Sequence, residues 1–218
     1  MIKGVLFDLD GTLIDSAPSI FRCFDEAFEI VFPHVTLTEA DRISFFGPTL
    51  VNTFTKYTDD LQIVDQAVEV YIKCSHREHD ENLILAFPNA KETLKELQQQ
   101  GYKIGVVTSK RNLMARRGLK NNKLLKYVDV VVGFDNVTNH KPNPESLLKA
   151  SELLNLKPEE LVYVGDHVND VFAAKACNMK SVAVEFSYFI DKIKMHNPDY
   201  IIKDLLEILE IVKEENYV

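Results

Sequence analysis

Polar residues that could carry out phosphoryl chemistry occur at four separate places in this chain. Residues 8–12 read Asp-Leu-Asp-Gly-Thr, which places the carboxylates of Asp8 and Asp10 two positions apart. The three later places supply hydroxyls, an ammonium group and two more carboxylates, from Thr108, Ser109, Lys141, Asp166 and Asp170. Carboxylate oxygens suit Mg²⁺, and a reacting phosphoryl group needs cations and donors around its oxygens. The set predicts Mg²⁺-assisted phosphoryl chemistry, although each residue alone also suits a helix cap, a turn or a solvated surface.

Short buried strands are the elements expected to position these residues. Five apolar runs rich in Val and Ile are typical of strands in a parallel sheet covered on both faces. They cover residues 2–7, 103–107, 128–132, 161–164 and 181–184. Asp8, Thr108 and Asp166 each follow such a run within two residues, and Lys141 follows the third run after a short loop. Because ligands of open α/β sheets bind at the carboxyl ends of the strands, we expect the four places to meet there.

Helical patterns alternate with the strands. They cover residues 90–100, 145–154, 169–177 and 205–212. Gly101 and Asn178 are expected to end two of these helices, since Gly and Asn tolerate the left-handed backbone of a helix stop. The alternation predicts an α/β fold with a doubly wound parallel sheet, Rossmann-like in type.

Residues 17–83 break this alternation. The segment shows helical periodicity and no convincing strand, and residues 61–79 are its longest helical candidate. It holds five Lys/Arg against twelve Asp/Glu, and so carries nearly all of the chain's net charge of −8. We therefore predict a core domain from residues 1–16 and 84–218, with an inserted α-helical cap domain at residues 17–83.

Composition excludes several classes of function. The acidic balance of the 218 residues disfavours a nucleic-acid partner, which normally meets a basic protein. No apolar run approaches the roughly 20 residues of a membrane span, and the first acidic residue comes too early for a signal peptide. Three widely spaced cysteines, an odd number, argue against a disulfide framework and for a reducing compartment. We expect a cytoplasmic protein with no membrane partner.

With these motifs the chain resembles the haloacid dehalogenase superfamily of phosphatases over essentially its whole length. The family's first motif is similar to residues 8–12 and its second to Thr108. Its third is similar to Lys141, and its fourth to the Gly-Asp pair that ends at Asp166, with Asp170 four residues later. The order and spacing agree. The resemblance implies that the insertion is the helical cap of one branch of this family.

The resemblance also implies a mechanism. Asp8 would attack phosphorus and form an aspartyl-phosphate. Asp10 would protonate the leaving group and then deprotonate the water that hydrolyses the intermediate. Dehalogenases lack the second aspartate, because a halide needs no proton, so Asp10 argues against dehalogenation. Thr12 and Gly165 depart from the β-phosphoglucomutase-like pattern and favour hydrolysis over phosphotransfer.

Phosphate and metal ligands are implied in the same way. Thr108, Ser109 and nearby amides would bind phosphate oxygens, while Lys141 would balance the charge of the nucleophile and the phosphate. Mg²⁺ would be held by Asp8, the main-chain carbonyl of Asp10, Asp166 and, in support, Asp170.

The insertion suggests a substrate. Gly47, Pro48 and Thr49 lie in a Phe-Phe-Gly-Pro-Thr-Leu segment that resembles the cap loop of phosphoglycolate-phosphatase-like and pyrophosphatase-like members. This loop, the His-rich residues 76–80 and the segment before Lys141 resemble the bacterial pyrophosphatase branch. Inorganic pyrophosphate would need cations near its second phosphate. The candidates for this role are Arg42, Lys73, His76 and Arg77 from the cap and Lys110 from the core.

Two alternatives stay open. In the first, the substrate is 2-phosphoglycolate or another small phosphorylated metabolite. In the second, the chain is a receiver-like signalling module in which Asp8 accepts phosphate without turnover. The cap and Asp10 oppose the second alternative, because such a module needs neither substrate enclosure nor a proton donor.

Overall fold

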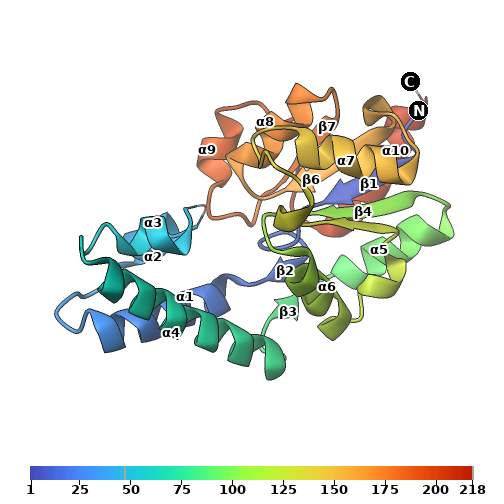
Figure 1. The fold of residues 1–218 in the computed structure, drawn as a ribbon. Helices are drawn as coiled ribbons and strands as arrows, with labels where there is room; N and C mark the ends of the chain where they lie inside the picture. The colour runs from blue at the N-terminus through green and yellow to red at the C-terminus, as the bar shows by residue number, and fades with distance from the viewer. Residues whose placement is uncertain (47, 218) are drawn as a thin grey trace. The chain divides into compact units, whose positions relative to one another are not determined.

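The computed structural model describes residues 1–46 and 48–217, which form two compact units (Figure 1). Met1–Asp15 and Leu85–Val218 make the first unit, and Ser16–Ile84 make the second. The chain therefore leaves the first unit after Asp15 and returns to it at Leu85, some seventy residues later.

A six-stranded sheet forms the centre of the first unit. Its strands are β1 (Gly4–Phe7), β4 (Lys103–Val107), β5 (Val130–Val132), β6 (Leu161–Gly165), β7 (Lys180–Val184) and β8 (Tyr200–Ile202). The order is β5-β4-β1-β6-β7-β8, and every neighbouring pair is parallel. Because β1 lies inside and the chain winds outward from it in both directions, the predicted doubly wound α/β sheet is confirmed.

Helices cover both faces of this sheet. The longer ones are α5 (Ala90–Gln99), α6 (Asn112–Asn121), α7 (Glu145–Leu154), α8 (Val168–Ala176) and α10 (Ile208–Tyr217). Side chains alternate along a strand, so Leu6, Val107 and Tyr163 pack with α7 and α8, while Ile104 and Val106 point to the other face, where α5 lies (Figure 1). No helix in the described part of the chain is long and apolar enough to cross a membrane.

Helix ends follow the local signals that the sequence carries. Helix α7 spans the predicted residues, and Gly101 and Asn178 adopt the expected positive φ values of 85° and 59°. The last helix differs from the prediction, because Leu205–Glu207 form a 3₁₀ turn and α10 follows it. Strand β8 and the short helix α9 (Ile190–Lys194) were not predicted.

A small two-stranded sheet joins the points where the chain leaves and re-enters the first unit. β2 (Ile14–Asp15) pairs antiparallel with β3 (Leu85–Ala86), so that Ile14 lies opposite Ala86 and Asp15 opposite Leu85. The amide of Phe87 also donates to the carbonyl of Leu13. The two crossings are therefore held side by side.

The second unit contains helices and connecting loops and no strand among its described residues. It contains α1 (Ala17–Val31), α2 (Glu39–Ser44), α3 (Leu50–Phe54) and α4 (Leu61–Asp80). Its core is aromatic, with five buried phenylalanines: Phe24, Phe28, Phe32, Phe45 and Phe54. Thr38 and Asp41 form a reciprocal capping box at α2, and Asp60 caps α4 by accepting from the amide of Gln62. The longest helix lies where the periodicity predicts it.

The cysteines correct one prediction. A disulfide joins Cys23 in α1 to Cys74 in α4, whereas Cys177 is a buried free thiol. The two helices pack along one another and bring the Cα atoms of the pair to 5.3 Å. An odd cysteine count and wide spacing in sequence say nothing about such tertiary proximity, so the expectation of no disulfide was wrong. The inference of a reducing compartment loses its support with it.

Candidate active site

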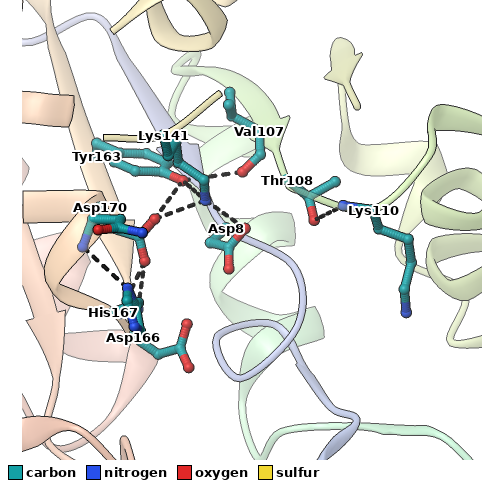
Figure 2. A network of polar contacts seen from close by, with 10 residues as sticks. Asp8, Val107, Thr108, Lys110, Lys141, Tyr163, Asp166, His167 and Asp170 are labelled. Atoms are coloured by element: carbon teal, nitrogen blue, oxygen red, sulfur yellow. Dashed lines mark hydrogen bonds and ion pairs between the residues drawn. The ribbon is translucent and has the colours of Figure 1, made fainter. Parts of the chain in front are cut away.

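The predicted core residues meet at one edge of the six-stranded sheet (Figure 2). Asp8 directly follows β1, Thr108 directly follows β4 and Asp166 directly follows β6. Both β4 and β6 pair in parallel with β1, which brings these three strand ends to the same edge. Lys141 stands in the loop before α7, and Asp170 lies in the first turn of α8.

Lys141 contacts three other residues of the site. Its Nζ lies 2.7 Å from Asp170 Oδ1, 2.9 Å from the Tyr163 hydroxyl and 3.1 Å from Asp8 Oδ1. The lysine side chain is only 7% exposed. Burial alone would lower its pKa, but the carboxylates of Asp170 and Asp8 raise the pKa well above its ordinary value. Lys141 therefore remains a buried cation beside the expected nucleophile.

Asp170 connects this lysine to the end of β6. Its Oδ1 accepts from Lys141, while its Oδ2 accepts from the backbone amides of Asp166 and His167. Any side chain at Gly165 would collide with the Asp170 carboxylate, which explains the glycine there. His167 closes the turn, because its Nδ1 accepts from the amide of Asn169. Asp170 thus positions both the lysine and the Asp166 turn.

Three carboxylates cluster beside Lys141. Oxygens of Asp8, Asp166 and Asp170 all lie within 4.8 Å of one another. Burial, together with the neighbouring carboxylates, raises the pKa of Asp8 to about 7 although Lys141 opposes the shift. The same causes, burial first, raise the pKa of Asp166 well above its ordinary value. The cluster therefore holds more negative charge than one lysine balances.

A divalent cation fits this donor set. Hard oxygen ligands from buried carboxylates are the chemistry that Mg²⁺ selects, and the raised pKa values show a local need for positive charge. Asp8, Asp166 and Asp170 are the residues that would hold it. The carboxylate of Asp10 is not among these three clustered side chains, and the contribution of its main-chain carbonyl to a metal site stays a prediction.

Asp10 has a separate electrostatic partner. Its Oδ1 lies 2.8 Å from the Nζ of Lys110, and both side chains are about one quarter exposed. Gly11 lets the chain turn here with a φ of 77°, and a side chain at this glycine would collide with the carboxylate of Asp166. The turn thus separates two carboxylates that are close in sequence, and a cation faces Asp10 on the accessible side.

The hydroxyl residues after β4 do not serve as helix caps. Thr108 is buried, and its Oγ1 accepts from the amide of Lys110, while Ser109 is exposed. Helix α6 starts further along, with Arg111 at its N-cap position. Both hydroxyls therefore stay at the sheet edge, where a phosphate ligand is expected.

Glu145, which the sequence analysis did not single out, binds the loop that carries Lys141. Glu145, in the first turn of α7, accepts from the backbone amides of Thr138 and Asn139 at 2.8 Å and from the Asn139 side chain at 2.7 Å. These hydrogen bonds lower the pKa of Glu145. The Lys141–Pro142 peptide that follows is cis. We call these contacts of Glu145 with Thr138 and Asn139 the clamp of the Lys141 loop, and the spacing of these residues in the sequence does not predict it.

Two further contacts at the site come from Tyr163 and Ser187, which lie in an apolar strand segment and in a loop and carry no motif in the sequence. Tyr163 lies within the buried run of β6, and its hydroxyl reaches Lys141. Ser187, in the loop after β7, donates from its Oγ to the carbonyl of Asp166 at 2.5 Å. Both depend on tertiary contacts, and the hydroxyl on a buried strand is the one sequence signal that could have identified Tyr163.

The candidates in the second unit lie among their own ion pairs. Arg42 Nε is 2.8 Å from Asp25, and Arg77 pairs with Glu26 at 2.5 Å. Lys73 pairs with Glu69 at 2.7 Å, and His76 is exposed on α4. Pro48 and Thr49 are exposed, with Thr49 capping α3, whereas Gly47 lies outside the described residues.

Comparisons with known proteins place the chain within one family. Residues 5–184 match the family described as haloacid dehalogenase-like hydrolase. A Bacillus mycoides (strain KBAB4) protein named pyrophosphatase PpaX is 38% identical over 216 residues, which are 99% of this chain and 99% of the relative. The Bacillus cereus (strain B4264) protein of the same name is 37% identical over 99% of this chain and 98% of its own length.

Solved structures agree on the fold. The crystal structure of a predicted phosphoglycolate phosphatase from Haemophilus somnus 129PT superposes with a TM-score of 0.87. The match covers 96% of this chain and 97% of that one, at 24% sequence identity. At this identity the likeness concerns the fold alone.

Proposed function

The chain belongs to the haloacid dehalogenase-like hydrolase family, and from this premise we propose that it is a Mg²⁺-dependent inorganic pyrophosphatase. The observation that carries the chemistry is the contact of Lys141 with Asp8 and Asp170 beside the clustered carboxylate of Asp166. The substrate rests on the 37–38% identity, over nearly the whole chain, to proteins named pyrophosphatase.

Asp8 is the nucleophile of this proposal. One of its oxygens forms a bond to a phosphorus of pyrophosphate, while the bond from that phosphorus to the bridging oxygen breaks. Lys141 favours the ionised form of Asp8, although burial raises its pKa. Thr108 and Ser109 donate hydrogen bonds to the oxygens of the transferred phosphoryl group.

Asp10 is the proton donor and acceptor. It gives its proton to the bridging oxygen, which leaves as phosphate. It then takes a proton from the water that attacks the aspartyl-phosphate, so that the second phosphate departs and Asp8 is restored. Lys110, 2.8 Å from Asp10, faces the leaving phosphate and balances its charge.

Asp8, Asp166 and Asp170, with the Asp10 carbonyl, would hold Mg²⁺, which would supply the withdrawal of charge from the phosphoryl oxygens. Asp170 keeps the Asp166 turn and Lys141 in place through its two oxygens.

Residues 1–16 and 84–218 act as the catalytic core in this proposal, and residues 17–83 act as a cap domain that selects the substrate. Gly47, Pro48, Thr49, Arg42, His76 and Arg77 are its specificity residues. Replacing Arg42 and Arg77 together with Gln should raise the KM for pyrophosphate. Arg22→Gln is the matched control, since Arg22 pairs with Glu78 in the same unit and is not a candidate. An unchanged KM removes these arginines from the proposal.

The deciding experiment is phosphate release by the purified protein in Mg²⁺. Pyrophosphate is compared with 2-phosphoglycolate, sugar phosphates and nucleotides, and Asp8→Asn is the inactive control. We expect the highest kcat/KM with pyrophosphate and no turnover by the variant. Replacing Mg²⁺ with chelator should abolish activity.

Each other outcome has a distinct meaning. A higher kcat/KM for a carbon monoester keeps the chemistry and changes the substrate to a small phosphorylated metabolite. Full activity of Asp8→Asn refutes the nucleophile. A stable phospho-aspartate without turnover favours a receiver-like module.

A cytoplasmic location is part of the proposal, based on the acidic, membrane-span-free sequence. The Cys23–Cys74 disulfide removes the cysteine argument for it. Cell fractionation with a tagged chain tests the location directly.

A further inference from the structure

The ammonium of Lys141 has a full set of acceptors. A lysine has three N–H donors, and three oxygens surround this one, at 2.7, 2.9 and 3.1 Å. Two of the acceptors are the carboxylates of Asp170 and Asp8, and the third is the neutral hydroxyl of Tyr163. The direction of each N–H is therefore determined by the other two contacts.

The Tyr163 hydroxyl is itself held in place. A phenol has one hydrogen to donate, and the Val107 carbonyl lies 3.0 Å away, closer than Asp170 Oδ1 at 3.3 Å. Val107 ends β4 and Tyr163 lies on β6, with β1 between these strands. The phenol thus reaches across the end of the strand that carries Asp8, and the side chain is 1% exposed.

This arrangement fixes the lysine relative to the nucleophile. With the phenol as the third acceptor, Lys141 presents one N–H to Asp170 and one to Asp8 Oδ1. Figure 2 shows the other carboxylate oxygen of Asp8 turned away from the lysine. Without the phenol oxygen, one N–H of a buried ammonium lacks a partner and the lysine rotates to find one. The longest of its contacts, the one to Asp8, is the first to be lost.

We propose that Tyr163 is a positioning residue that orients Lys141 toward the nucleophile Asp8. This inference rests on the proposed hydrolase activity, because Tyr163 acts on the proposed nucleophile Asp8 through Lys141.

Tyr163→Phe tests the inference, because it removes one oxygen and keeps the ring that packs in the core. We expect kcat to fall about 10- to 100-fold, the range seen when a group that orients an active-site ligand is removed, with KM within about threefold of the wild type. Tyr200→Phe is the matched control, since it removes a 2.6 Å phenol contact with Glu215 far along the sheet, on β8. It should leave kcat unchanged.

A crystal structure of Tyr163→Phe supplies a second readout. The inference predicts that Lys141 Nζ moves out of hydrogen-bond distance of Asp8 Oδ1. A kcat within twofold of the wild type overturns the inference, and so does a lysine that keeps both carboxylate contacts. A matching loss of kcat in Tyr200→Phe would mean a general effect of stability, and it overturns the inference as well.

The wild-type protein decides the matter if the variant does not fold. NMR of protein labelled with ¹⁵N-lysine should show a slowly exchanging ammonium signal that is absent from Lys141→Arg and has a nuclear Overhauser contact with a tyrosine ring. Absence of that contact overturns the inference. If the wild type hydrolyses no phosphate compound, the proposed function fails instead, and the two failures are thereby distinguished.

Discussion

Two aspartates separated by one residue receive opposite electrostatic surroundings. Asp8 is buried beside Lys141 and two other carboxylates, and burial raises its pKa to about 7. Asp10 lies on the more accessible side of the Gly11 turn and pairs with Lys110. The roles of nucleophile and proton carrier that we propose for them need different environments, and a single turn provides both.

The leaving group tests the role of Asp10. Asp10→Asn keeps the size of the side chain and removes the proton, so kcat for pyrophosphate should fall roughly 10²- to 10⁴-fold. Hydrolysis of p-nitrophenyl phosphate should fall much less, because p-nitrophenolate leaves without protonation. Steady-state kinetics with the two substrates measure the difference. Equal losses for both would show that Asp10 serves binding or the second step and does not protonate the leaving group.

Glu145 gives a second prediction at the residue scale. Glu145→Gln removes a charged acceptor from the amides of Thr138 and Asn139, and the loop that carries Lys141 should shift. We expect kcat to fall about tenfold, inside the roughly hundredfold that a 1 Å misplacement costs.

The control for Glu145 lies on the same helix. Glu152→Gln removes an exposed carboxylate of α7 that pairs only with Lys149 among the contacts described, and it should leave kcat unchanged. A Glu145→Gln variant with wild-type kcat would show that Pro142 and the start of α7 position the loop without the clamp.

At the scale of elements, the disulfide between α1 and α4 carries a stability prediction. It closes a loop of 51 residues, and reduction should lower the free energy of unfolding by about 2–4 kcal/mol. Denaturant unfolding with and without dithiothreitol measures this difference. Thiol titration of the unfolded chain should give one reactive cysteine before reduction and three after it.

Matched variants make the disulfide prediction specific. The double substitution Cys23→Ala with Cys74→Ala should unfold at the same denaturant concentration with and without reductant. Cys177→Ala keeps the disulfide and should stay sensitive. Three titratable thiols in the untreated protein would refute the disulfide.

The predicted elements are those whose signal is local. The strands of the central sheet appear as uninterrupted apolar runs because they are buried on both faces, and Gly101 and Asn178 mark helix ends through their own backbone preference. β2 and β3 have two residues each and pair across the whole insertion, so no local pattern announces them. β8 is an edge strand in which only Ile202 is buried, so it lacks the continuous buried run of the central strands.

The site divides in the same way. The sequence predicted that Asp8, Thr108 and Asp166 lie at one edge of the sheet. This prediction needs only parallel strands that each end just before one of these residues. Tyr163 and Glu145 were missed, because their contacts depend on the path of side chains between elements. The roles of all these residues in catalysis stay predictions until the variants are measured.

At the scale of the whole molecule, the clustered carboxylates link stability to pH and metal. The pKa of Asp8 is raised from 3.8 to about 7 in the folded protein, so folding favours its protonated form. The resulting stabilisation is complete below about pH 4 and is lost as pH rises through 7. Asp166 acts in the same direction. Without divalent metal, the unfolding temperature should therefore fall between pH 6 and pH 8.

Magnesium should reverse this trend, because it replaces the protons that the carboxylates release. A ligand at 100 times its Kd stabilises a protein by about 2.7 kcal/mol, so the increase in unfolding temperature should be larger at pH 8 than at pH 6. Differential scanning fluorimetry with Mg²⁺ or chelator measures both. Asp8→Asn is the control and should show a flatter pH dependence. An identical slope in the two proteins would contradict the assignment to Asp8.

The paired crossings of β2 and β3 have a consequence for modularity. Antiparallel neighbours lie about 5 Å apart, so Asp15 and Leu85 mark an opening that a turn of two to five residues is long enough to close. Everything between them, Ser16–Ile84, is a separate compact unit with its own aromatic core. The second unit is thus an insertion whose two ends lie next to one another on the first unit. A family with such a junction can replace the insert while the sheet that carries Asp8 stays unchanged. Under the proposed role of the insert, such a replacement would change the choice of substrate.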